Sequence, residues 1–136
     1  MSRAALSGDP DAQFNLGVCY ASGLGVSVDL PQAARWYRKA AERGNEKAET
    51  NLGYLYFRGG KGVARDYKEA VKWFSRAAEK GVAVAQAHMG DCHYIGAGVE
   101  KSKDKAVEYY RLAAAQGDSR ARARLQEIFK NAKAAE

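Results

Sequence analysis

One motif returns three times along the chain, at steps of 36 and 37 residues. Each copy holds an Ala, a Leu-Gly or Met-Gly pair, a glycine-rich turn ending in Val, two adjacent aromatic residues, an Ala-Ala pair and a closing Gly. The copies run from Ala12 to Gly44, from Ala48 to Gly81 and from Ala85 to Gly117. A period of this length is typical of stacked arrays, in which each unit buries a face that its neighbour supplies. The sequence therefore predicts such an array.

Each repeat divides into two helices at its glycine-rich turn. Asp9 and Pro10 have the form of an N-cap and a first helical residue, and apolar residues then recur every four positions to about Ala21. Asp29 followed by Gln32 has the form of a capping box for the second helix. Asp66 with Glu69 repeats this box, whereas Ser102 with Lys105 completes only half of it.

Three glycines lie inside the predicted first helices, namely Gly17, Gly53 and Gly90. A glycine in a helix interior costs roughly 1 kcal/mol relative to Ala. Because this cost recurs at one motif position, we expect a neighbouring helix to pass there too closely for a side chain.

The repeat frame continues beyond the three full copies. Ala4-Ala5 with Gly8 matches the end of a second helix, and Asp118 with Ala121 matches the start of a first helix. The predicted organisation is one domain over 1–136. It comprises a partial helix over 1–8, repeats over 9–44, 45–81 and 82–117, and a capping helix over 118–136. An uncovered capping helix favours a monomer or weak self-association, with Phe129 either exposed or folded back.

Composition places few limits on partners. A net charge of +6 suits nucleic acid, an anionic membrane surface or an acidic protein. Cys19 and Cys92 occupy one motif position two repeats apart, which exceeds the roughly 7 Å reach of a disulfide, so two buried free thiols are expected. No apolar run approaches the roughly 18 residues of a membrane helix, so no membrane insertion is expected. The opening residues are too short a stretch for a signal peptide, which favours a cytoplasmic location. A periplasmic or secreted location is the alternative if a signal peptide has been removed.

This spacing resembles the SEL-one-like repeat family, relatives of the tetratricopeptide repeats, over nearly the entire chain. The resemblance implies an all-α, right-handed superhelical solenoid of antiparallel helix pairs, with the first helices lining the concave side. It also implies an adaptor or scaffold in protein complexes. Repeat three departs from the pattern and is expected to be less regular, at Val82, Met89, His93 and Ser102.

If the first helices line a groove, their outward residues form the candidate partner surface. Aromatic residues beside Arg and Asn suit an extended peptide or a docked helix, including one with an acidic segment. The candidate partner-binding residues are Phe14, Asn15, Asn51, Tyr54, Phe57, Arg58, His88, Asp91, Arg120 and Arg124. In this hypothesis Tyr54 and Phe57 are buried by the partner, and the arginines orient it. The alternative is that the aromatic residues only pack between adjacent repeats.

The sequence predicts no catalytic residue, metal site or cofactor, and therefore no enzyme. His88 and Cys92 lie four apart on one helix, but neither Asp91 nor His93 completes a tetrahedral set of metal ligands. The cysteines occupy structural motif positions, and no His–Asp partner set for a nucleophile is evident. Two alternatives to an adaptor stay open. One is a basic helical-repeat module that binds RNA or DNA, and the other is a structural spacer within a larger scaffold.

Overall fold

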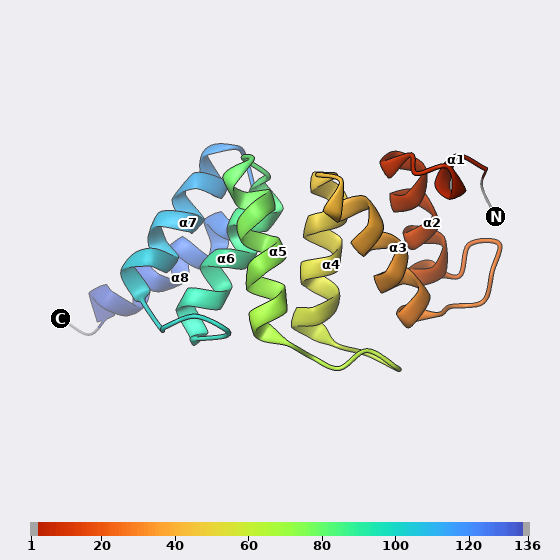
Figure 1. Ribbon diagram of the computed structural model, residues 1–136. Coiled ribbons are helices and arrows are strands. Elements are labelled where there is room, and N and C mark those ends of the chain that lie inside the picture. The colour runs from red at the N-terminus through yellow and green to blue at the C-terminus, as the bar shows by residue number, and fades with distance from the viewer. Residues whose placement is uncertain (1–2, 135–136) are drawn as a thin grey trace.

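The structure, a computed structural model, describes residues 3–134. Within that range the chain is all-α, with eight helices in chain order and one isolated bridge between Gly60 and Val63. The helices are α1 (Arg3–Leu6), α2 (Pro10–Ser22), α3 (Leu30–Glu42), α4 (Glu46–Arg58), α5 (Tyr67–Glu79), α6 (Ala83–Ile95), α7 (Lys103–Ala115) and α8 (Ser119–Ala134). Figure 1 shows them following one another from one end of the array to the other, with α1 and α8 at opposite ends.

Helices adjacent in sequence pack against each other along the whole array. The pairs α2 with α3, α4 with α5, and α6 with α7 form the three repeats, and α8 packs on α7. Packing between repeats joins α3 to α4 and α5 to α6. The predicted α-solenoid of helix pairs is therefore confirmed.

A glycine of each first helix lies against an aromatic ring of the second helix in the same repeat. A Cβ added to Gly53 would lie 2.7 Å from the ring of Phe74. The equivalent distances are 2.6 Å for Gly17 with Tyr37 and 2.5 Å for Gly90 with Tyr110. The predicted lack of room for a side chain is confirmed, and the group that fills the space is an aromatic ring of the second helix rather than its backbone.

The capping boxes predicted for the second helices form only in part. The side chain of Asp29 accepts a hydrogen bond from the backbone N–H of Gln32 at 3.1 Å. The second half of the predicted capping box is replaced, because the backbone N–H of Asp29 donates to the carbonyl oxygen of Tyr20 at 2.9 Å. Asp66 and Ser102 make the equivalent backbone bonds, to Tyr56 and His93. Each of these bonds ties the end of a turn back to the first helix of its repeat.

Both cysteines are free, as predicted, but only Cys92 is buried. Burial raises the pKa of its thiol to about 12. Cys19 is partly exposed, so the expectation of two buried thiols is wrong for this residue. The physical reason is its place on α2, which only the four-residue α1 precedes among the described residues.

The capping helix α8 covers the end of the last repeat. Ile128 is buried in a cluster with Ala106, Tyr110 and Ala113 of α7. Phe129 stays 48% exposed, and the guanidinium carbon of Arg111 lies 5.6 Å from its ring centre. Self-association through this helix stays a prediction.

Candidate functional site

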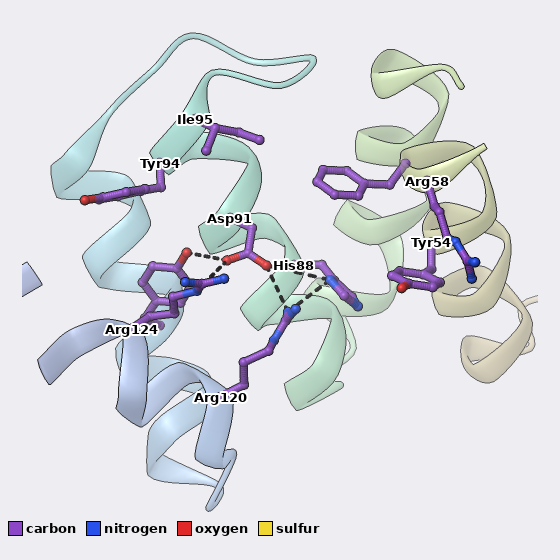
Figure 2. Close-up of a pocket in the computed structure, with 10 residues that line it drawn as sticks. Tyr54, Arg58, His88, Asp91, Tyr94, Ile95, Arg120 and Arg124 are labelled. Carbon is purple, nitrogen blue, oxygen red and sulfur yellow. Dashed lines mark hydrogen bonds and ion pairs between the residues drawn. The ribbon is translucent and has the colours of Figure 1, made fainter. Parts of the chain in front are cut away.

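Seven of the ten predicted partner-binding residues line one cavity of about 490 Å³ between α4, α6 and α8. We call this cavity the α8 pocket, and Figure 2 shows its lining. The lining residues are Tyr54, Phe57, Arg58, His88, Asp91, Tyr94, Ile95, Tyr110, Arg120 and Arg124.

Helical spacing explains why these side chains meet. Residues three or four apart lie on the same face of a helix. Tyr54 and Arg58 are four apart on α4, Asp91 and Ile95 are four apart on α6, and Arg120 and Arg124 are four apart on α8. One face from each of three successive first helices therefore points into the same space.

The other three predicted residues lie outside the α8 pocket. Asn51 lines an adjoining cavity of about 450 Å³, which shares Tyr54, His88 and Arg120 with the α8 pocket. Phe14 and Asn15 line a separate cavity of about 530 Å³ between α2 and α4. These two residues are therefore not brought together with the rest.

Asp91 is the centre of a polar cluster in the α8 pocket. Its Oδ2 lies 3.0 Å from Nη2 of Arg120, and its Oδ1 lies 3.6 Å from Nε of Arg124. The hydroxyl of Tyr110 donates to the same Oδ1 at 2.5 Å. The side chain of Asp91 is only 14% exposed, whereas those of Arg120 and Arg124 are 45% and 47% exposed. The carboxylate thus holds two half-exposed guanidinium groups in place.

This pairing corrects one expectation about the arginines. The sequence places Arg120 and Arg124 as cations available to an acidic partner, but both already contact Asp91. An arginine carries five N–H donors, so each retains donors that can face a ligand. Arg58 is different, because it is exposed and has no ion-pair partner among the described residues.

His88 is buried rather than outward-facing, at 7% exposure. Its ring is stacked on Phe74 with centres 4.7 Å apart, and Tyr54 lies 5.3 Å away. Nη2 of Arg120 lies 3.0 Å from Nδ1, so Nδ1 is the acceptor and the neutral ring carries its proton on Nε2. Burial, followed by the charge of Arg120, lowers the pKa of His88 from 6.5 to about 4.

We expect acid to destabilise the fold through His88. Between pH 6.5 and 4 the unfolded chain binds a proton that the folded His88 does not, so the stability present above pH 6.5 is lost as the pH falls. The contribution lost between pH 7 and 4.5 is about 2–3 kcal/mol. Urea unfolding of the wild type and of His88→Gln over this range measures the difference. An identical pH dependence in both proteins would contradict the assignment.

Of the two predicted aromatic residues in the pocket, one packs between helices and the other is exposed to solvent. Phe57 is partly buried and contacts Tyr67 and Phe74, so it serves mainly to join α4 to α5. Tyr54 is 44% exposed and keeps a face open to solvent. The packing alternative therefore describes Phe57 better than Tyr54.

Three residues that line the pocket are not among the ten predicted partner-binding residues. Tyr94 and Ile95 are 38% and 56% exposed and extend its apolar wall. Ile95 lies one turn after Asp91 on α6, and this spacing predicts that the two side chains lie on the same face of the helix. Tyr110 is predictable as a packing residue opposite Gly90, but the reach of its hydroxyl to Asp91 depends on the orientation of the two helices.

Residues 3–134 offer neither a cluster of metal ligands nor a membrane-spanning helix. No group of three or more His, Cys, Asp or Glu side chains there is arranged to hold a metal ion. No helix in this range is both long enough and apolar enough to cross a membrane. His93, the remaining histidine, is buried and stacks on Tyr109 with ring centres 5.6 Å apart.

A stack of antiparallel helix pairs, with cavities along its first helices, defines a helical-repeat protein of the tetratricopeptide-related class. The family model for the Sel1 repeat matches residues 10–45, 46–82 and 83–118. This chain therefore belongs to the Sel1 repeat family. Proteins of this family are generally non-catalytic protein-interaction scaffolds.

Solved structures and curated relatives agree with this assignment. The chain is 41% identical to c5321, a protective antigen of uropathogenic Escherichia coli strains with an SLR fold. Their TM-score is 0.92 over 96% of this chain and 28% of that one. A Sel1 repeat protein from Oxalobacter formigenes is 42% identical, with a TM-score of 0.79 over 91% of this chain and 92% of that one. The DAP3-binding cell death enhancer 1 of Rattus norvegicus is 45% identical over 53 residues, or 39% of this chain. The match spans only 10% of the length of that relative.

Proposed function

We propose that this chain is an adaptor or scaffold module that binds a peptide or helix of a partner protein along α4, α6 and α8. The observation that carries the proposal is the composition of the α8 pocket. Exposed Tyr54, Tyr94 and Ile95 lie in one cavity with Arg58, Arg120 and Arg124. Aromatic and arginine side chains are the residues that most often dominate the energy of protein interfaces.

The apolar wall supplies the driving force for binding. Large apolar side chains that gather at the surface of a folded protein are typical of interaction sites. A cavity of about 490 Å³ falls within the range of sites that enclose ligand groups. Burial of the open face of Tyr54 and of Ile95 by a partner removes apolar area from water and so favours the complex.

The Asp91 cluster supplies orientation. Because Asp91 and Tyr110 are largely buried, they hold Arg120 and Arg124 close to one geometry before any partner arrives. Preorganised donors lose less conformational entropy on binding than free side chains do. The free donors of these arginines suit carboxylates or carbonyl oxygens of the partner.

One relative supports a protein partner. The rat protein that matches this chain over 53 residues is named for binding DAP3. The shared segment is part of a Sel1 array in this chain, so a protein ligand is the class of partner favoured here.

Affinity capture from native lysate tests the proposal. We expect wild-type chain to capture protein partners with or without nuclease, and Tyr54→Ala/Arg58→Glu to retain less than a tenth of them. Both side chains are exposed, so the variant keeps its fold. Arg124→Glu is less suitable, because it would place a carboxylate beside Asp91 and Glu127.

The control is Leu112→Ala/Lys103→Glu, which likewise truncates one large exposed side chain and reverses one positive charge, but on α7. Partners that Tyr54→Ala/Arg58→Glu captures as well as the control does would contradict the proposal. Capture that disappears with nuclease would favour the nucleic-acid alternative.

A further inference from the structure

A second cavity, of about 510 Å³, lies beside the α8 pocket at the turn between α4 and α5. We call it the turn pocket. Its lining residues are Ala21, Val28, Leu30, Tyr37, Asn51, Tyr54, Leu55, Arg58, Gly59, Gly60 and Lys61. Tyr54 and Arg58 line both cavities, so the turn pocket continues the α8 pocket toward α3.

One wall of the turn pocket comes from the only irregularity in the repeat spacing. Gly60 is the extra residue that makes the second turn one position longer than the other two. Its backbone pairs with Val63 through bonds of 2.9 and 3.0 Å, and this pairing shapes the turn. The turn packs on α3, since a Cβ added to Gly60 would collide with Cδ1 of Leu30. The insertion thereby brings Lys61 to the cavity.

The charges of the turn pocket are not balanced. Arg58 and Lys61 are exposed, and neither has an ion-pair partner among the described residues. The lining includes no Asp or Glu, in contrast to the α8 pocket with Asp91. The lining also includes the aliphatic side chains of Val28, Leu30 and Leu55, and Val28 is 59% exposed.

We infer that the turn pocket binds a large apolar side chain of a partner segment whose neighbouring acidic residue pairs with Arg58 and Lys61. The inference rests on the proposed function and deepens it by giving the chemistry of the ligand. Unpaired cations beside an apolar surface select a carboxylate adjacent to an aliphatic or aromatic side chain. The segment then continues past Tyr54 into the α8 pocket.

A phage-displayed library of random heptapeptides provides the probe. We expect the peptides recovered on the wild-type chain to carry Asp or Glu within two positions of a large apolar residue. Fluorescence anisotropy of a recovered peptide should show at least tenfold weaker binding to Lys61→Glu. Changing the acidic residue of that peptide to Lys should restore binding to Lys61→Glu. Lys103→Glu, which alters the net charge equally on α7, is the control and should bind like the wild type.

Distinct outcomes separate the inference from the proposed function. Recovered peptides without acidic residues, or peptides bound equally by wild type and Lys61→Glu, overturn the inference. If Tyr54→Ala still abolishes their binding, the proposed function stands. Peptides bound equally by wild type, Tyr54→Ala and Lys61→Glu overturn both. Failure to recover any peptide also overturns the inference, and the lysate capture then decides the proposed function alone.

Discussion

Replacing Phe74 by Ala is expected to lower the free energy of unfolding by about 3–5 kcal/mol. The side chain is fully buried, and its ring lies against Gly53 of α4 and stacks on His88 of α6. One ring on α5 therefore joins two first helices from consecutive repeats. Its removal leaves a cavity that these helices cannot close, because Gly53 offers no side chain to fill it. Urea unfolding followed by circular dichroism measures the loss.

Phe129→Ala is the matched control for this prediction. It deletes the same side chain from a position that is 48% exposed, so we expect a loss of less than about 1 kcal/mol. Equal losses in the two variants would contradict the role given to Phe74 in joining the repeats.

Replacing Lys80 by Met is expected to lower the free energy of unfolding by about 3 kcal/mol. Nζ of Lys80 lies 2.8 Å from Oε1 of Glu49 and 3.0 Å from the carbonyl oxygen of Gly44. Glu49 is only 2% exposed, so the variant leaves a carboxylate buried without its cation. Because the side chain of Lys80 itself is 39% exposed, the expected loss of stability lies at the lower end of the range for broken buried ion pairs.

The next repeat supplies a rescue for this variant. At the equivalent positions, Nε2 of Gln116 donates to Oε1 of Gln86 and to the carbonyl oxygen of Gly81, both at 2.9 Å. Glu49→Gln/Lys80→Gln copies this neutral pair, so we expect it to recover most of the stability lost in Lys80→Met. A double variant as unstable as the single one would show that the buried charge is not the cause. Lys47→Met, at an exposed position, controls for removal of a lysine.

The geometry within a repeat was predictable because it depends on residues close in sequence. The glycines of the first helices predict a close neighbour, and in the structure that neighbour is an aromatic ring, as Phe74 is for Gly53. Turn lengths and N-caps likewise follow from local residue types. The capping box was predicted only in part, because a backbone carbonyl competes with the side chain of Gln32 for the same donor.

Contacts between repeats were much less predictable. The sequence places Asp91 and Arg120 on outward faces, but it does not give the rotation from one repeat to the next, which makes them face each other. The same rotation buries His88 between Phe74 and Tyr54.

The candidate site likewise combines features that the sequence predicts with features that depend on how the repeats stack. Seven of the ten predicted residues line the α8 pocket, because helical spacing aligns them on one face of α4, of α6 and of α8 and the stacking of the repeats brings these faces together. Phe14 and Asn15 lie one repeat earlier, on α2, and line a different cavity. The turn pocket was not predicted, because its wall depends on the packing of the Gly60 turn against Leu30.

Site-specific photo-crosslinking tests the central claim, that partners bind along α4, α6 and α8. A benzophenone amino acid is placed at Tyr54 in one protein and at Leu112 of α7 in another, since both positions are exposed. Irradiation in native lysate is predicted to join a protein partner to position 54, with little product at position 112. Crosslinks that form at position 112 and are absent at position 54 would contradict the account.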